Sequence, residues 1–138
     1  MTRRFEDTYR HKGLRKKLID SLRDKGINDE RVLAAMNNIP RHFFLDTALD
    51  NIAYEDRAFP IAEGQTISQP YTVAYQTQLL QVKPQEKILE IGTGSIYQAT
   101  VLAEMGAKVF TIERQKALFD KTKHFVLKSK YPGIKFFY

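Results

Sequence analysis

The stretch ILEIGTGSIYQATVLAEMGAKVFTIERQ, residues Ile88–Gln115, decides the fold class of this chain. Residues Lys87–Ile91 form an apolar run that predicts a strand and leads into the glycine-rich turn GTGS. The pattern then predicts a helix over Tyr97–Met105 and a second strand over Lys108–Glu113. A strand that runs into a glycine-rich turn and a helix N-terminus creates a small-molecule site, because glycines let the backbone approach a ligand closely.

The same alternation continues to the last residue. We predict a helix over Lys116–Lys130, a turn at Pro132-Gly133 and a third strand in IKFFY, residues 134–138. Because βαβ crossovers are right-handed, the three strands run parallel in the order 3-2-1. The predicted fold class is therefore α/β: a Rossmann-like parallel sheet, present as a βαβαβ half and preceded by an N-terminal helical region.

The region before the sheet is predicted to be mainly helical. We assign residues 1–82 to an N-terminal helical and loop region and residues 83–138 to the sheet, and expect one compact unit. The first helix ends near Gly26, and Asn28 or Asp29 caps a second one. The apolar stripe of the first helix consists of Leu14, Leu18 and Leu22.

The segment between these helices and the sheet carries polar residues. From Arg41 to Gln69 the pattern is irregular, and a long irregular segment in a compact domain is usually functional. ISQPYTVAYQTQLLQV then predicts a helix that Ser68 is placed to cap, with Pro70 in its first turn. His42 has no serine or cysteine nearby in the sequence, so we interpret it as structural.

Composition narrows the class of protein. The 138 residues, 43% of them hydrophobic, can bury a core. No apolar run reaches the roughly 18 residues of a transmembrane helix, and no apolar signal region follows the charged N-terminus. Cysteine is absent, which excludes thiolate metal sites and fits a reducing compartment, and His11 and His124 suggest no metal site either. We expect a cytoplasmic protein without a membrane segment or a metal.

The net charge of +6 is concentrated at the N-terminus, where residues 1–25 carry nine Lys and Arg against four Asp and Glu. Such a segment can follow a phosphate backbone. The leucine stripe in the same segment instead favours an amphipathic helix with a solvated basic face. We therefore do not expect nucleic acid as a partner.

An acidic residue completes the pattern around the turn. Glu113 lies 21 residues after Gly92, close to the offset of about 20 residues expected for a carboxylate that binds the ribose hydroxyls. The alternative is an exposed acid at a strand end. The dinucleotide pattern is not met, because Tyr97 stands where the third glycine would fall, and no Walker lysine follows the turn.

LEIGTGS, with Glu90 inside the strand, resembles the first motif of class I S-adenosylmethionine-dependent methyltransferases. With GQTISQPY, IPRHFF and YEDRAFPI upstream, the chain resembles one family among these, protein-L-isoaspartate O-methyltransferase. The resemblance implies methyl transfer from the cofactor S-adenosylmethionine to the α-carboxylate of isoaspartyl residues in damaged proteins. A carboxylate with a pKa of about 4 is already ionised at neutral pH, so such an enzyme mainly aligns its substrate.

The resemblance also implies roles for single residues. Ser68 matches the active-site serine of the family, whose hydroxyl would hold the substrate carboxylate, while helix capping alone is the alternative. Glu90 matches the motif acid, which lies under the methionine end of the cofactor. The implied cofactor-binding residues are Gln65, Thr66, Ser68, Glu90, Gly92, Gly94, Ser95 and Glu113.

Two features depart from the family pattern. Ile96 replaces a glycine, and a β-branched residue at positive φ costs more than the about 1–2 kcal/mol typical of L-residues. We expect its side chain beside the methionine arm of the cofactor. The family continues beyond IKFFY, so we expect Lys87–Ile91 to lie on an open sheet edge that favours self-association. Two alternatives to an active enzyme therefore stay open: a cofactor- or partner-binding remnant without turnover, and a nucleic-acid methyltransferase.

Overall fold

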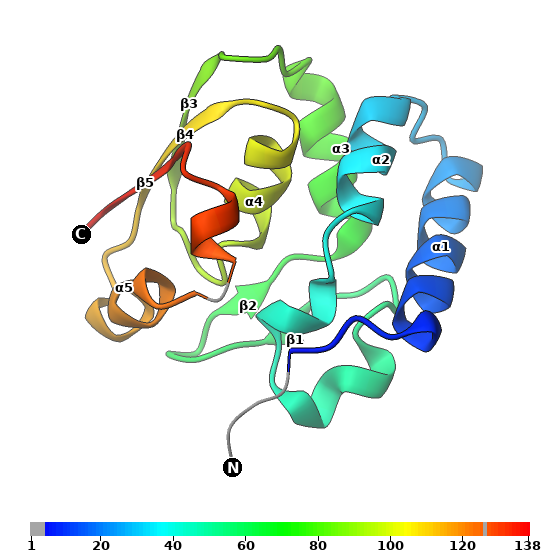
Figure 1. The fold of residues 1–138 in the computed structure, drawn as a ribbon, viewed down its shortest axis with the longest axis horizontal. Helices are drawn as coiled ribbons and strands as arrows, with labels where there is room; N and C mark the ends of the chain where they lie inside the picture. Colours follow the sequence, from blue (N-terminus) through cyan, green and yellow to red (C-terminus); the bar gives the residue numbers. More distant parts are fainter. Residues whose placement is uncertain (1–4, 126) are drawn as a thin grey trace.

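The computed structural model describes residues 5–125 and 127–138. Figure 1 shows helices α1 and α2 on one side and a three-stranded sheet on the other, with α3 and α4 between them. The helices are α1 (Tyr9–Asp24), α2 (Glu30–Asn37), α3 (Pro70–Leu80), α4 (Tyr97–Glu104) and α5 (Lys116–Lys123), with short 3-10 helices η1 (Arg41–Phe44), η2 (Thr47–Ile52) and η3 (Lys128–Lys130). The strands are β1 (Phe59–Pro60), β2 (Thr66–Ile67), β3 (Lys87–Ile91), β4 (Lys108–Ile112) and β5 (Ile134–Phe137).

Helices α1 and α2 pack against each other as the apolar pattern predicts. Leu18 and Leu22 are buried and Leu14 packs against the core, so the leucine stripe faces inward. Asp29 caps α2, because its carboxylate accepts the N–H of Arg31 at 3.0 Å. Both predicted N-terminal helices are therefore confirmed, and so is one of the two proposed caps.

The larger sheet is parallel and has the order β3-β4-β5, which confirms the predicted order 3-2-1. Strand β4 lies in the middle, and its Val109 and Thr111 have no exposed surface. Strand β3 forms one edge, where Leu89 and Ile91 are 62% and 74% exposed. The edge and one apolar face of β3 are thus uncovered in the described residues.

The helix predicted over Lys116–Lys130 is wrong in its second half. Helix α5 ends at Lys123, and a separate 3-10 turn, η3, begins five residues later, at Lys128. The break lets Phe125 turn inward, where its ring lies 4.6 Å from that of Phe44 between centroids. The contact between Phe125 and Phe44 forms where the helix has ended, so tertiary packing overrides the local helical pattern here. Residue 126 of the predicted helix lies outside the described residues.

A short antiparallel hairpin crosses the segment that the sequence left irregular. Strand β1 pairs with β2 in the register Phe59 with Ile67 and Pro60 with Thr66. Phe59 and Ile67 are both 2% exposed, so the hairpin is anchored in the core. This anchoring brings the residues after β2 towards the glycine-rich turn, as Figure 1 shows at the lower centre of the molecule.

The core is continuous across the predicted boundary between residues 82 and 83. The ring of Phe44 packs edge-on against that of Tyr97, with 5.2 Å between centroids, and α2 contacts α4. The two regions therefore share one core. Within the described part of the chain, no helix has the length and apolar character needed to cross a bilayer.

Candidate functional site

The glycine-rich turn joins β3 to α4 through three residues with positive φ. Gly92 (φ +92°) and Gly94 (φ +54°) adopt a region that suits glycine, and Ile96 (φ +69°) adopts it as well. The N–H groups of Gly92 and Thr93 donate to the Ile112 carbonyl at 2.8 and 3.2 Å, which fixes the turn to the end of β4. A Cβ built on Gly92 meets no atom within 4 Å, so the space beside this glycine is open.

Glu113 follows β4 and closes the turn from the side of the neighbouring strand. Its carboxylate accepts the N–H of Gly94 on one oxygen and the N–H of Gln115 on the other, both at 2.9 Å. The residue is only 4% exposed, so the alternative of an exposed strand-end acid is wrong. Each carboxylate oxygen can accept a further hydrogen bond, and the ribose contact stays a prediction.

Glu90 lies below the turn at the end of a buried polar chain. Its carboxylate accepts the hydroxyl of Thr111 at 2.6 Å, and the same hydroxyl lies 2.6 Å from that of Thr93. Burial raises the pKa of Glu90 to about 7, and the nearby Glu113 carboxylate adds to the rise while the Thr111 hydroxyl opposes it. Glu90 is therefore poised to ionise near neutral pH, and a cation beside it would favour the charged form.

A cleft of about 360 Å³ lies beside the turn, between the β3 edge, α3 and α4. It gathers most of the predicted site residues: Thr66, Ser68, Glu90, Gly92, Gly94 and Ser95. Gln65 and Glu113 do not line it. Gln65 is exposed, and its side-chain amide donates to the Glu63 carbonyl at 3.4 Å.

The cleft is also lined by polar side chains that the sequence pattern did not single out. Tyr97 and Gln98 reach it from α4 and Gln76 from α3. The Gln98 amide donates to the hydroxyl of Thr77 at 3.0 Å, which links the two helices. The sequence could have indicated Tyr97 and Gln98, because residues just after a glycine-rich turn lie on the first turn of the following helix and therefore close to the ligand site.

Ile96 does not lie where the sequence analysis placed it. Its φ of +69° confirms the expected strain, but its side chain is 1% exposed and belongs to the core. It lines a second cavity of about 550 Å³, whose walls include apolar side chains such as Phe44 and Leu118, polar ones such as Asp46 and Lys121, and Gly94 and Ser95 of the turn; it does not line the cleft of Glu90. The expectation that Ile96 crowds the methionine arm is therefore not supported.

The cap predicted for α3 is also wrong. Gln69 is the N-cap residue and provides no side-chain cap, and Pro70 holds the predicted first-turn position. The N–H of Tyr71 donates instead to the Asp56 carboxylate at 2.8 Å, so a residue 15 positions upstream caps the helix. Among the described residues, no side-chain hydrogen bond engages the Ser68 hydroxyl, which lines the cleft.

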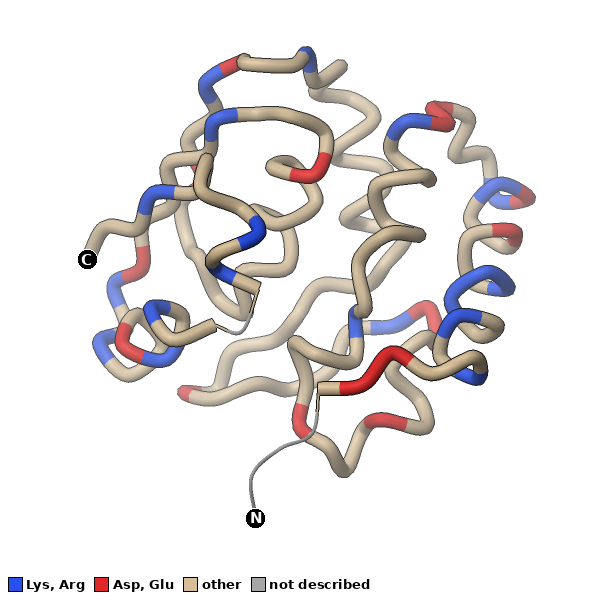
Figure 2. The backbone as a smooth tube through the Cα atoms, in the orientation of Figure 1, with Lys and Arg blue, Asp and Glu red and all other residues tan. Residues whose placement is uncertain are grey.

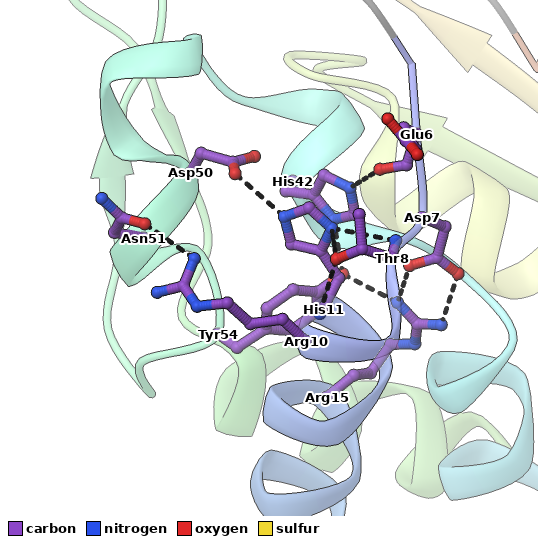
Figure 3. A network of polar contacts seen from close by, with 10 residues as sticks. All are labelled: Glu6, Asp7, Thr8, Arg10, His11, Arg15, His42, Asp50, Asn51 and Tyr54. Carbon is purple, nitrogen blue, oxygen red and sulfur yellow. Dashed lines mark hydrogen bonds and ion pairs between the residues drawn. The ribbon is translucent and has the colours of Figure 1, made fainter.

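A second polar cluster lies away from the cleft and holds the N-terminal segment (Figure 3). His11 and His42 stack with ring centroids 3.7 Å apart, and His11 lies 2.9 Å from Asp50. His42 lies 2.7 Å from the Tyr54 hydroxyl and 3.0 Å from the Glu6 carbonyl. The structural interpretation of His42 is therefore supported, whereas His11 is buried and not on a solvated face.

Metal ligation at this cluster would compete with bonds already formed. One ligand atom each of Asp7, His11 and His42 lie within 4.8 Å of one another. The Asp7 carboxylate, however, accepts two hydrogen bonds from Arg15 at 2.8 and 3.0 Å. Both imidazole nitrogens of His11 also have partners, Asp50 on one side and Thr8 on the other.

The basic charge of α1 is largely matched by acidic neighbours. Figure 2 shows blue and red segments interleaved along this helix. Arg15 is 5% exposed and pairs with Asp7, while Arg23 pairs with Glu30 at 2.9 Å. The exposed face of α1 thus carries charges of both signs. This agrees with the interpretation of α1 as an amphipathic helix with a solvated face.

The fold and the site define a class of protein, the Rossmann-like nucleoside-binding enzymes. The defining features are the parallel sheet, the glycine-rich turn with Glu90 in the strand before it, and Glu113 after the next strand. The model of one family, protein-L-isoaspartate(D-aspartate) O-methyltransferase, matches residues 13–137. The chain belongs to this family.

Individual relatives agree with the family match. The protein-L-isoaspartate O-methyltransferase of Christiangramia forsetii is 57% identical over 127 residues, which are 92% of this chain and 60% of the relative. That of Cytophaga hutchinsonii is 65% identical over 119 residues, 86% of this chain and 54% of the relative. The chain thus spans a little over half the length of the curated relatives that it matches.

Solved structures give the same result for the fold. A protein-L-isoaspartate O-methyltransferase superposes with a TM-score of 0.78 and 26% identity, over 88% of this chain and 41% of its own. A putative family member from Plasmodium falciparum, in complex with S-adenosyl-L-homocysteine, gives a TM-score of 0.71 and 25% identity, over 88% of this chain and 61% of its own. The Rossmann-like fold is thereby confirmed.

Proposed function

We propose that this chain provides the S-adenosylmethionine-binding part of a protein-L-isoaspartate O-methyltransferase. The reaction is methyl transfer to the α-carboxylate of isoaspartyl residues in damaged proteins or peptides. One observation carries the proposal: Ser68 and Glu90 line the same cleft as the glycine-rich turn. The family match supports the reaction class, and the structure with S-adenosyl-L-homocysteine supports the cofactor.

The residues of the cleft fit the cofactor chemically. Gly92 and Gly94 leave room for close approach, because a Cβ on Gly92 would meet no atom and one on Gly94 only Ile61, at 3.8 Å. Glu90 would pair with the ammonium group of the methionine end, and Glu113, which lies behind the turn and outside the lining of the cleft, would accept the ribose hydroxyls. Thr66 and Ser95 supply further hydroxyls at the cleft. When bound, the cofactor supplies an electrophilic methyl group on a sulfonium.

Ser68 would act by alignment and not by proton transfer. The substrate carboxylate, with an ordinary pKa of about 4, needs no base at neutral pH. The Ser68 hydroxyl can donate a hydrogen bond to it, since the cap of α3 is supplied by Asp56 and not by Ser68. Holding the carboxylate in line with the methyl group lowers the barrier through proximity and orientation.

Binding and transfer are tested separately. Calorimetry with S-adenosyl-L-homocysteine measures the cofactor site, and transfer of labelled methyl to an isoaspartyl peptide, with the matching aspartyl peptide as control, measures the reaction. We expect micromolar binding that Glu113→Ala weakens by about 1–3 kcal/mol, the loss of charge-assisted hydrogen bonds. Absence of binding in the folded chain would reject the cofactor site.

The transfer assay also separates the alternatives. Binding without transfer to the isoaspartyl peptide would favour a binding remnant, which is an outcome to consider because the chain spans only part of its relatives. Transfer to an RNA probe in preference to the peptide would favour a nucleic-acid methyltransferase. The cytoplasmic location remains a prediction from composition, and fractionation of cells would check it.

A further inference from the structure

Arg41, in η1, contacts the segment that carries Ser68 and is not one of the predicted site residues. The side chain is 1% exposed although it carries a charge. Its Nε donates to the Ala53 carbonyl at 3.1 Å, and its Nη2 donates to the carbonyls of Ser68 at 2.9 Å and Arg57 at 3.4 Å. The guanidinium carbon also lies 4.9 Å from the ring centroid of Tyr97, which lines the cleft. One side chain therefore contacts both walls of the cleft.

Core packing alone does not explain a guanidinium at this position. Among residues 5–125 and 127–138, no ion pair compensates Arg41, and its Nη1 has no hydrogen-bond acceptor. A buried charge of this kind is often replaced without loss by an apolar side chain of similar volume. An apolar residue cannot supply the planar fork, which joins three carbonyls and an aromatic face at fixed geometry.

Asp56 holds the other end of the same segment. One carboxylate oxygen accepts the Tyr71 N–H at 2.8 Å, and the other accepts Lys25 of α1 at 2.6 Å. The backbone carbonyl of Asp56 accepts the side-chain amide of Gln69 at 3.1 Å. Gln69 and Tyr71, which both follow Ser68, are thus bonded to the loop between η2 and β1.

We propose that Arg41 and Asp56 are positioning residues for Ser68. Arg41 fixes the carbonyl of Ser68 relative to Tyr97, and Asp56 fixes the start of α3. Together they hold the Ser68 hydroxyl in one position in the cleft. The inference rests on the proposed function, in which that hydroxyl aligns the substrate carboxylate. A displacement of about 1 Å at such a group is enough to lower a rate by about a hundredfold.

The Asp56 contact is tested by hydrogen exchange of single amides, measured by NMR on the whole chain. Asp56→Ala removes the acceptor of the Tyr71 N–H, and this amide should exchange at least about tenfold faster. Asp56→Asn retains a carbonyl oxygen and should restore slow exchange. Lys25→Gln is the matched control, because it removes only the exposed partner of Asp56. Equal exchange at Tyr71 in Asp56→Ala and the unsubstituted chain would overturn the inference.

The Arg41 contact is tested with Arg41→Lys, which keeps the charge but has no fork. We expect faster exchange confined to residues 66–73 and about fivefold weaker binding of S-adenosyl-L-homocysteine. Arg57→Lys, the same substitution on an exposed arginine of the adjacent loop, should change neither. Faster exchange spread evenly over α1 and α4 would indicate a general packing role and overturn the inference.

The two proposals fail in different ways. If the unsubstituted chain does not bind S-adenosyl-L-homocysteine, the proposed function is rejected, and local exchange still decides whether Arg41 and Asp56 hold Ser68. If the chain binds S-adenosyl-L-homocysteine and amide exchange at residues 66–73 is unchanged in both Asp56→Ala and Arg41→Lys, the proposed function stands and the positioning role is rejected.

Discussion

Replacing Ile96 by glycine and by alanine tests how the turn tolerates a β-branched residue at φ +69°. Two effects oppose each other in Ile96→Gly. Removal of the left-handed strain stabilises the fold by about 1–2 kcal/mol or slightly more. Loss of a side chain that is 1% exposed costs about 2–5 kcal/mol, because a cavity remains in the core. The expected net change is a loss of about 2 kcal/mol in the free energy of unfolding.

Ile96→Ala separates the two effects, since it leaves almost the same cavity but keeps a Cβ at positive φ. In an ordinary helical position glycine is less stable than alanine by about 1 kcal/mol. At position 96 the order should reverse, with Ile96→Gly more stable than Ile96→Ala by about 1 kcal/mol.

Urea unfolding measures both variants, and the midpoint shift counts as stability only if the slope is unchanged. If Ile96→Ala proves as stable as Ile96→Gly or more so, the residue does not adopt the left-handed region. The affinity for S-adenosyl-L-homocysteine should stay within about twofold in both variants that fold, because the Ile96 side chain does not line the cleft.

Four further predictions concern single residues. With a pKa of about 7 for Glu90, affinity for S-adenosyl-L-homocysteine should rise about eightfold from pH 6.0 to 7.5, as the carboxylate ionises, and calorimetry on Glu90→Gln should show no such rise. Asp29→Ala should lower the free energy of unfolding by about 1 kcal/mol, because α2 loses its cap. Ser68→Ala should change it by less than about 0.5 kcal/mol, because Ser68 does not cap α3. Thermal unfolding of the two variants measures both changes. Burial lowers the pKa of His42 below its ordinary 6.5, so the folded state binds a proton less readily than the unfolded state. The free energy of unfolding should therefore fall as the pH drops below 6.5, and urea midpoints at two pH values measure this. His42→Gln should reduce the pH dependence. Leu89→Lys on the open β3 edge should shift sedimentation towards the monomer if the unsubstituted chain self-associates there, and unchanged association would point to another surface.

Local signals were sufficient for the elements whose determinants are close in sequence. The Asp29 cap lies two residues from the N–H that it accepts, and the strand order follows from the handedness of short crossovers. The cleft was predictable for a similar reason, because Glu90 and the turn that begins at Gly92 are adjacent along the chain.

Contacts between distant residues account for the errors. The cap of α3 comes from Asp56, 15 residues before Tyr71, and nothing in ISQPY indicates that partner. Helix α5 ends early because Phe125 packs on Phe44, a contact across some eighty residues. The buried His11 bonds to Asp50, 39 residues away, a partner that the pattern of the first helix does not indicate. Sequence pattern shows which face of an element is apolar but not which distant residue will meet it.

The geometry of the glycine-rich turn depends on residues of two adjacent strands. Its N–H groups are bound by the Ile112 carbonyl and the Glu113 carboxylate, and Glu90 is held by Thr111. All of these partners lie on or just after β3 and β4, so the cofactor end of the site is shaped within the described residues. The position of Ser68 depends instead on η1 and on the loop that carries Asp56. Cofactor binding therefore depends mainly on β3, β4 and Glu113, whereas the position of Ser68 depends on Arg41 and Asp56, and Glu113→Ala should weaken cofactor binding more than Arg41→Lys does.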